Sequence, residues 1–350
     1  MRVTLKQIAA QTGFHHSTVS RALRGDRALP EETRARIRQA AEKLGYRPDP
    51  YLAGLIAHRS ARRSRRFRAV LGWLNNWPER AGWRRWVVFR QVFLGAQKRA
   101  DALGYRLEDF WLAAPSLSPA RAAHVLQTRQ INGLIVAPQP EPQGIGDFDF
   151  ARFAAVAIGQ TLRAPALHSV TSDHYHNMVL LVRALQGQGF RRIGYVTTAS
   201  GEARTNGHWS SGFAWAITDG GRVAPPIPPL TIANDDTAPL GAWYRRHRPD
   251  VIASTCPVAT LRRLREMGLR VPHDVSLACA ALNDDARFVA GISEHPELIG
   301  AAAVDMVVEL LHKDERGIPA VPRRLTIPGS WTEGPSVRGP QLSGARVGAA

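Results

Sequence analysis

Residues 3–23 read VTLKQIAAQTGFHHSTVSRAL, and this stretch decides the fold of the N-terminal part of the chain. Thr4 followed by Gln7 forms a capping box, which predicts the start of a helix. Gly13 interrupts the helical spacing of apolar residues where a tight turn needs a residue without a Cβ atom, and a second helix is predicted from about His16 to Leu23. Two short helices joined at a glycine, the second one polar and basic outside, indicate a helix-turn-helix. The pattern alone leaves a generic three-helix bundle with a solvated basic face as the alternative.

The charge of the chain points to a polyanionic partner for this same segment. The 350 residues carry 46 Lys and Arg against 29 Asp and Glu, a net charge of +17. Residues 1–68 hold 16 of the basic residues and only 5 of the acidic ones. A protein this basic usually meets nucleic acid or an anionic membrane surface. No apolar run is long enough to span a bilayer, and the N-terminus shows no apolar signal core, so we expect neither a membrane span nor export.

The remaining features of the N-terminal part predict a headpiece followed by a linker. A third helix is expected from about Glu31 to Leu44, and Gly45 ends it. We expect the headpiece to occupy residues 1–46, and a hinge helix with a basic linker to occupy 47–68, where six arginines lie between Arg59 and Arg68. A large core is then expected over 69–333 and a flexible tail over 334–350.

The motifs of the N-terminal segment resemble the headpiece of the LacI/GalR family of bacterial repressors in order and spacing. The matching stretches are Val3–Ala9, Gly13, Ser17–Leu23, Glu32–Arg34 and Leu44–Pro48. The resemblance implies that the second helix enters the major groove of DNA. His16, Ser17 and Arg21 match the base-reading positions, and an arginine there suits a bidentate contact with guanine.

Further DNA contacts are implied by the same resemblance. Thr4, His15, Thr18 and Arg24 fall at positions that match phosphate contacts, and Leu55 matches a hinge-helix leucine that wedges into the minor groove. Two residues depart from the family pattern. His15 stands where a Ser or Thr usually caps the recognition helix, and Pro30 stands where a capping Ser or Thr usually opens the third helix.

From about residue 69 the pattern changes to short apolar runs that alternate with helical stretches. This alternation predicts parallel sheets covered on both faces, arranged as two similar lobes. The segments Gly189–Ile193, Gly212-Phe213 and Gly268–Ser276 resemble motifs of the family's periplasmic-binding-protein-like core. The resemblance implies three crossings between lobes. We expect a first lobe over 69–160 plus 289–320, a second lobe over 161–288 plus 321–333, and a small-molecule effector bound between them.

The residues expected to face the effector depart from the family pattern. Trp209 stands at the position of an arginine that usually grips the ligand, and Ser254-Thr255 stand about where an Asn-Asp pair is usual. Tryptophan is abundant near the expected cleft edge of the first lobe, at Trp73, Trp77, Trp83 and Trp86. An indole can stack on a sugar ring, but tryptophan at this density is more often core or dimer packing. The candidate effector-binding residues are Trp73, Asn75, Asp173, Trp209, Ser254, Asn283 and Asp284. This set favours a neutral, donor-rich ligand such as a sugar derivative over a sugar acid or phosphate.

Signals for an enzyme are weak, because neither a phosphate loop nor a Gly-x-Ser-x-Gly motif is present. Cys256 and Cys279 make no metal pattern, and His174 and His176 should diverge at the start of a helix, so we expect no metal site and no cofactor. The sequence therefore predicts a cytoplasmic, dimeric, effector-modulated DNA-binding regulator of a near-palindromic operator, associated with the nucleoid when it is bound there. The alternatives are a solute-binding protein with the same core and an architectural DNA binder that needs no effector.

Overall fold

The computed structural model describes residues 4–23, 29–44, 46, 69–115, 117–219, 225–233, 236–282 and 288–338. The chain divides into two compact units, residues 1–66 and 67–350. The expected hinge helix and basic linker over 47–68 lie outside the described residues.

The N-terminal unit contains the expected helices, which are α1 (Leu5–Thr12), α2 (His16–Leu23) and α3 (Glu31–Lys43). The Gln7 side chain accepts a hydrogen bond of 2.7 Å from the backbone N–H of Thr4, as a capping box requires. Gly13 follows α1 with φ of 75°, a left-handed conformation that glycine adopts at little cost. The helices share one small core, in which the most buried side chains are Ile8, Val19, Ala22 and Ile37. The predicted helix-turn-helix fold is confirmed.

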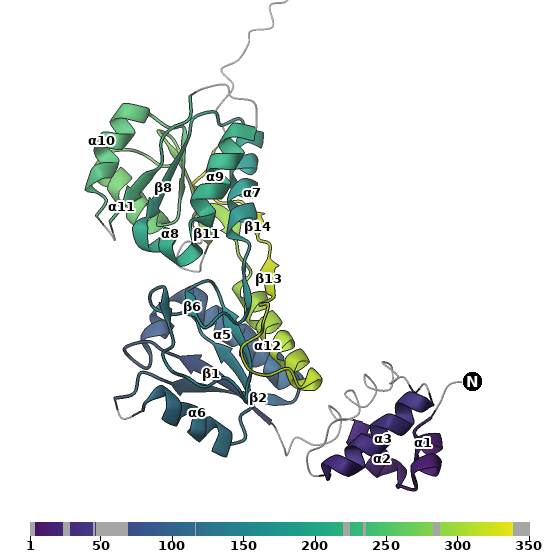
Figure 1. Ribbon diagram of the computed structural model, residues 1–350. Helices are drawn as coiled ribbons and strands as arrows, with labels where there is room; N and C mark the ends of the chain where they lie inside the picture. The colour runs from purple at the N-terminus through teal and green to yellow at the C-terminus, as the bar shows by residue number, and fades with distance from the viewer. Residues whose placement is uncertain are drawn as a thin grey trace, which may run out of the picture. The chain divides into compact units, whose positions relative to one another are not determined.

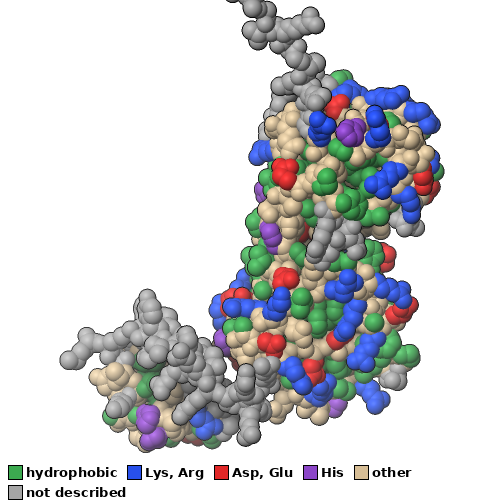
Figure 2. All heavy atoms as spheres, turned by 180° about the vertical axis from the view of Figure 1, so that it is seen from behind, with side chains coloured by type: hydrophobic (Ala, Val, Ile, Leu, Met, Phe, Trp, Pro, Cys, Tyr) green, Lys and Arg blue, Asp and Glu red, His purple; other side chains and the backbone are tan. Residues whose placement is uncertain are grey.

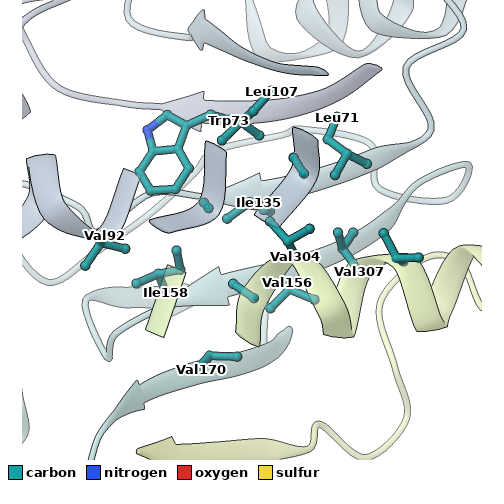
Figure 3. Packing of buried hydrophobic residues seen from close by; sticks show 14 of the residues in the cluster. Leu71, Trp73, Val92, Leu107, Ile135, Val156, Ile158, Val170, Val304 and Val307 are labelled. Carbon is teal, nitrogen blue, oxygen red and sulfur yellow. The ribbon is translucent and has the colours of Figure 1, made fainter. Parts of the chain in front are cut away.

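The first lobe of the larger unit, which carries the labels β1 and β2 in Figure 1, is a parallel sheet with the strand order β13-β7-β5-β3-β1-β2. Its strands are β1 (Ala69–Asn75), β2 (Tyr105–Trp111), β3 (Gly133–Val136), β5 (Ala154–Ile158), β7 (His168–Ser172) and β13 (Arg324–Ile327). Helices α5 (Val87–Ala102) and α12 (Pro296–Lys313) cover one face, and Figure 3 shows their valines among those of the strands. Helix α6 (Pro119–Thr128) covers the other face. The shorter elements of this lobe are η1 (Gly82–Arg85), β4 (Gln143–Gly144) and β6 (Leu162–Ala164).

The second lobe repeats this plan with the strand order β14-β12-β11-β10-β8-β9. Its strands are β8 (Ile193–Thr198), β9 (Leu230–Ile232), β10 (Val251–Ser254), β11 (Ser276–Leu282), β12 (Ala290–Ser293) and β14 (Ser330–Thr332), the last antiparallel to β12. Helices α7 (His174–Gly187) and α9 (His208–Asp219) pack on one face, and α10 (Ala238–His247) and α11 (Pro257–Glu266) pack on the other. A short helix, α8 (Ala199–Thr205), follows β8. The expected two-lobed core with parallel sheets is confirmed.

Glycines allow two pairs of helices to approach closely. A Cβ atom on Gly300 of α12 would lie 1.9 Å from the carbonyl oxygen of Val92 in α5, and one on Gly95 would lie 2.1 Å from the carbonyl oxygen of Glu297. In the second lobe, a Cβ atom on Gly212 of α9 would lie 2.5 Å from the carbonyl oxygen of Tyr175 in α7. Larger residues at these positions would force the helices apart, since packed interiors leave little room to relax.

The crossings between the lobes fall later in the chain than the sequence predicted. The chain leaves the first sheet after Ser172, returns to it after Ser293 and leaves it again after Ile327. The predicted lobe boundaries at 160/161, 288/289 and 320/321 are therefore too early in the chain: the first misplaces β6 and β7, the second misplaces β12, and the third misplaces β13. One of the strands that the sequence did not predict is β7, whose sequence HSVTS is short and mostly polar although all five residues are buried.

The predicted tail begins too early in the chain. Residues 334–338 pack on the second lobe, where the buried Ser336 hydroxyl donates to the carbonyl of Leu277 at 2.6 Å and accepts from the backbone N–H of Ala290 at 2.8 Å. Residues 339–350 lie outside the described part. Among the helices that the structure describes, none combines the length and the apolar character needed to cross a bilayer.

Candidate DNA-binding and interlobe sites

The exposed face of α2 carries the residues that the sequence assigned to base reading. Val19 and Ala22 are buried and fix the orientation of the helix. His16, Ser17 and Arg21 are consequently exposed on its other side. Figure 2 shows histidine side chains at the surface of this unit. The helix thus presents one imidazole, one hydroxyl and one cationic group on a single exposed face.

His15 caps α2 at the position where a Ser or Thr is usual. Its Nδ1 lies 2.8 Å from the Ser17 hydroxyl and accepts a long hydrogen bond of 3.4 Å from the backbone N–H of Ser17. The rings of His15 and His16 also lie with their centroids 4.1 Å apart. The imidazole therefore supplies an acceptor to the first turn, whose N–H groups otherwise have no partner within the helix.

The other predicted DNA contacts are only partly described. Thr4 is exposed at the start of α1, and its hydroxyl lies 3.1 Å from the Gln7 side-chain oxygen. Thr18 is half-buried in α2. Arg24 and Leu55 lie outside the described residues.

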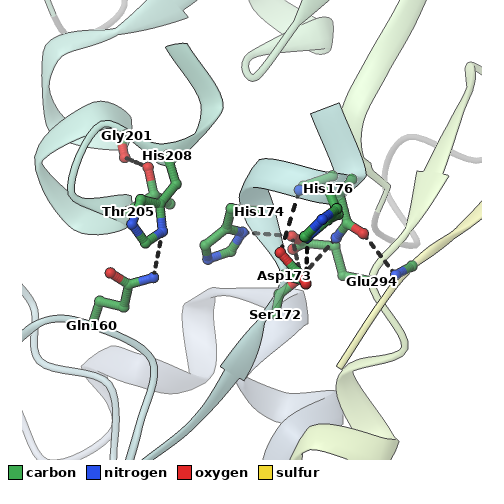
Figure 4. A network of polar contacts seen from close by, with 12 residues as sticks. Gln160, Ser172, Asp173, His174, His176, Gly201, Thr205, His208 and Glu294 are labelled. Atoms are coloured by element: carbon green, nitrogen blue, oxygen red, sulfur yellow. Dashed lines mark hydrogen bonds and ion pairs between the residues drawn. The ribbon is translucent and has the colours of Figure 1, made fainter. Parts of the chain in front are cut away.

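The three crossings of the larger unit are joined by a polar network, which we call the crossover network. It consists of Ser172, His174, Asn177, Glu294 and Gly329. The Ser172 hydroxyl donates to Glu294 at 2.7 Å and accepts from the Asn177 amide at 2.9 Å. The Asn177 side-chain oxygen accepts from the backbone N–H of Gly329 at 2.7 Å. Each crossing therefore contributes at least one member, and the network lies where the lobes must hinge (Figure 4).

Glu294 is the charged centre of this network. Only 7% of the residue is exposed, and burial by itself would raise the pKa of its carboxyl. In the acid range where a carboxyl titrates, the charge of His174 and hydrogen bonds from His174, Ser172 and Asn177 outweigh burial and lower the pKa. Glu294 is therefore an anion near neutral pH, and its lone pairs are used by neighbours rather than by water.

Beside the network lie four side chains from both lobes that we call the interlobe site: His174, Trp209, His208 and Gln160. The rings of His174 and Trp209 meet edge to face, with centroids 5.1 Å apart. The Gln160 amide nitrogen lies 3.0 Å from Nδ1 of His208. The indole N–H of Trp209 is buried and has no hydrogen-bond partner among the described residues. A buried donor without a partner is costly, so a ligand that accepts from it would be favoured.

Arginines bridge the lobes next to this site. Arg204 of α8 donates through Nη1 to the carbonyl oxygens of Gln139 and Pro140 at 2.9 and 2.6 Å, and its guanidinium lies 5.2 Å from the ring centre of Phe89. Arg163 of the first lobe donates to the second lobe at 3.1 Å, to the Asn206 side chain and the Ala203 carbonyl. Burial lowers the pKa of Arg204.

Comparisons with known proteins match both units of the chain. Residues 4–49 match the family model described as bacterial regulatory proteins, lacI family, and residues 182–337 match the periplasmic binding protein-like domain. The chain belongs to the LacI/GalR family. It is 25% identical to the transcriptional regulator GalR of Lacticaseibacillus casei over 90% of this chain and 95% of that protein. It is 23% identical to the repressor PurR of Salmonella arizonae over 91% of this chain and 94% of that protein.

Solved structures of LacI-family regulators share the fold. The complex of the regulator CelR with cellobiose gives a TM-score of 0.59 at 17% identity, with 96% of this chain and 100% of that chain covered. The Lac repressor dimer bound to operator and the anti-inducer ONPF gives 0.55 at 17% identity, with 96% and 99% covered. The two family models and the GalR and PurR relatives identify the protein as a DNA-binding transcriptional regulator, and the solved structures show that it has the two-lobed core of its family.

Three of the residues predicted to bind the effector in this LacI-family core have fully buried side chains that contact only other parts of the protein. Trp73 is fully buried among Trp83 and Phe93, so it offers no surface to a ligand. Asn75 is also fully buried; its amide donates to the Arg80 carbonyl at 2.7 Å and its oxygen accepts from the N–H of Trp77 at 3.1 Å. These two predictions are corrected by the burial of the side chains.

Ser254 is the third corrected residue. It is fully buried, and its hydroxyl accepts from the backbone N–H of Cys256 at 3.1 Å and lies 2.9 Å from the Thr260 hydroxyl, at the start of α11. Asp173 accepts from the N–H of His176 at 3.3 Å, and its side chain is 20% exposed. Trp209 does lie at the interlobe site. Asn283 and Asp284 lie outside the described residues.

The tryptophans of β1 and of the segment after it divide into two groups. Trp73 and Trp83 belong to the core, whereas Trp77 and Trp86 line an open groove of about 570 Å³ together with Pro78, Gly82 and Pro140. The sequence did not single out Glu294, Gln160, His208 or Arg204 as site residues. Their residue types carry no motif, and only the fold brings them together.

Proposed function

We propose that this LacI-family protein is a dimeric, cytoplasmic repressor that binds a near-palindromic operator. Its affinity for the operator rises or falls when a small molecule binds between its lobes. Two copies of α2 read the two half-sites, since dimer symmetry imposes symmetry on the DNA site. The exposed His16, Ser17 and Arg21 on a helix anchored by buried Val19 and Ala22 are the observation that carries this proposal. The likeness of fold to the Lac repressor dimer bound to operator supports it.

The DNA contacts divide by role. Arg21, with His16 and Ser17, contacts base edges, while Thr4, His15, Thr18 and Arg24 contact phosphates and set the register. The Nδ1 of His15 is used within α2, so its Nε2 is the atom left for a phosphate. Leu55 wedges into the minor groove at the operator centre and kinks it. The protein is associated with the nucleoid when it occupies such a site.

The effector is a neutral, polyhydroxylated molecule, such as a sugar derivative. Support comes from the interlobe site, where Trp209 offers an unused donor and an indole face, and from the lowered pKa of His208, caused first by burial and then by the charges of His174 and Arg324. A neutral imidazole has one donor and one acceptor, which suit hydroxyl groups, and it carries no positive charge to attract an anion. The CelR structure named for its cellobiose complex supports this class of ligand.

Selection of bound sites from random DNA with the full-length protein tests the proposal. We expect a two-fold symmetric motif, and binding that falls steeply with salt, with a log–log slope on the order of −6 to −10 if about that many phosphates are neutralised. A featureless or asymmetric motif would favour an architectural DNA binder. The absence of any DNA binding would favour a solute-binding protein with the same core.

A further inference from the structure

His174 is held in a defined orientation by a buried carboxylate. Its Nδ1 lies 2.9 Å from Oε1 of Glu294, and only 13% and 9% of the two side chains are exposed. The Ser172 hydroxyl donates to the same carboxylate oxygen at 2.7 Å, so this oxygen acts as an acceptor. An imidazole nitrogen next to such an acceptor carries the ring proton, which leaves the other ring nitrogen with a lone pair.

The second nitrogen of His174 faces the interlobe site. Figure 4 shows the His174 ring between Glu294 and the Gln160–His208 pair. His208 is close enough for its pKa to respond to His174. Among the described residues no hydrogen bond is made by Nε2 of His174, and the nearby indole N–H of Trp209 has no partner either. The site therefore offers one acceptor and one donor that the protein itself does not use.

We propose that Glu294 is a positioning residue for the interlobe site: it holds His174 with Nδ1–H on its carboxylate, so that Nε2 accepts a hydrogen bond from a hydroxyl group of a neutral polyhydroxylated ligand. The proposal rests on the proposed function and names the group that recognises the effector. Trp209 donates its indole N–H to an oxygen of the same ligand. Glu294 also accepts a hydrogen bond from Ser172 of the first crossing. The same carboxylate therefore positions the ligand-binding histidine and joins two of the crossings between the lobes.

Asp173 provides an internal comparison for Glu294. It is also a carboxylate paired with a histidine, since its Oδ2 lies 2.9 Å from Nδ1 of His176. The His176 side chain, however, is 70% exposed, so water can serve its second nitrogen. The two pairs thus have the same chemistry, but only the Glu294–His174 pair is buried and directed at the interlobe site.

The tautomer of His174 tests the positioning role without any ligand. Long-range ¹H–¹⁵N spectra of the histidine-labelled protein at pH 8 distinguish Nδ1–H from Nε2–H imidazoles, and the His174→Asn variant assigns the signal. We expect Nδ1–H for His174 in the wild type and a shift toward Nε2–H in Glu294→Ala. Glu294→Gln keeps an acceptor oxygen and should retain Nδ1–H. An Nε2–H tautomer in the wild type, or an unchanged signal in Glu294→Ala, would overturn the proposal.

Two further variants separate this effect from general damage. Asp173→Asn should change the signal of His176 and leave that of His174 unchanged. Should Glu294→Ala fail to fold, Glu294→Asp decides: the shorter carboxylate cannot reach Nδ1 at 2.9 Å without movement of the ring, so the Nδ1–H population should fall. A His174 signal identical to the wild type in Glu294→Asp would count against positioning.

Ligand binding tests the second half of the proposal. A thermal-shift screen with cellobiose, lactose, galactose and ribose uses neutral saccharides as probes, and the best one is titrated calorimetrically. Loss of one hydrogen bond should weaken binding roughly tenfold in His174→Phe, with no change in His176→Phe. Stabilisation by none of these probes would refute the ligand class. The tautomer result would still decide positioning, and selection of DNA sites separately decides the proposed function.

Discussion

Arg204 of the second lobe donates a hydrogen bond of 2.6 Å to the carbonyl oxygen of Pro140 in the first lobe, so a guanidinium joins the lobes directly. The same Nη1 atom reaches the carbonyl of Gln139, and the ring of Phe89 lies beneath the guanidinium. Trp209 occupies the position where the family resemblance implies an arginine that binds the ligand. A cation is nevertheless present near the lobe interface, five residues earlier in the chain, and it binds protein backbone.

Removal of this bridge should loosen the contact between the lobes. Arg204→Met keeps an apolar stem against Phe89 but loses the donors to Gln139 and Pro140. We expect faster amide hydrogen exchange over residues 139–143 and 199–208, because the hydrogen bonds that Arg204 makes between these two segments are lost. Arg106→Met is the matched control: Arg106 pairs with Glu108 within the first lobe and should leave both segments unchanged. Equal exchange in Arg204→Met and the wild type would show that the lobes do not depend on the bridge.

The headpiece could be predicted from the sequence because its determinants are local. The capping of α1 by Gln7 and Thr4, the turn at Gly13 and the burial of Val19 and Ala22 all lie within 23 consecutive residues. Propensity, capping and apolar spacing agree there, as they must where a short segment specifies its own structure.

The crossover network could not be predicted from the sequence because its members are distant in the chain. Ser172 and Glu294 are 122 residues apart, and neither belongs to a motif. Their meeting depends on β7 lying in the first sheet, and that strand was missed because the sequence HSVTS lacks apolar periodicity. Ser254 and Asn75 were assigned to a ligand for a different reason. Each lies at the end of a strand, and such a position predicts the edge of a site but does not reveal whether the side chain is buried.

Acidification should break the contact between His208 and Gln160. The pKa of His208 is lowered, first by burial and then by the charges of His174 and Arg324, while Asp173 opposes them. A histidine with a lowered folded-state pKa contributes stability above its unfolded value of about 6.5, and this contribution is lost as the pH falls through the folded-state pKa. The stability difference between the wild type and His208→Gln should therefore shrink from pH 7.5 toward pH 5.

Urea unfolding at several pH values measures this difference. His124→Gln provides the control, because His124 is exposed on α6 and its substitution should leave the pH dependence as it is in the wild type. If the difference in unfolding free energy between the wild type and His208→Gln stays constant over this range, protonation of His208 does not break its contact with Gln160.

Gly300 should not tolerate even a methyl group. A Cβ atom there would lie 1.9 Å from the carbonyl oxygen of Val92, which belongs to the backbone of α5 and cannot move away by a rotamer change. We expect Gly300→Ala to lower the free energy of unfolding by about 3 kcal/mol, at the upper end of what overpacking costs. Gly187→Ala, at the exposed end of α7 with nothing within 4 Å, should instead be neutral or stabilise by roughly 0.5 kcal/mol. Equal stabilities for the two variants would contradict the close packing of α5 and α12.

Arg21→Ala should lose base discrimination as well as affinity. Arg21 is exposed on α2, where a bidentate contact with guanine is worth about 1–3 kcal/mol of selectivity. The measurement is the ratio of dissociation constants for the selected operator and a scrambled duplex, at one fixed salt concentration because phosphate contacts make affinity depend on salt. We expect this ratio to fall by a factor of roughly 5 to 100. Arg38→Ala removes the same charge from the exposed side of α3 and should weaken both duplexes about equally, which leaves the ratio near its wild-type value. If Arg21→Ala instead behaves as Arg38→Ala does, then Arg21 contacts a phosphate, and base reading must be assigned to His16 and Ser17.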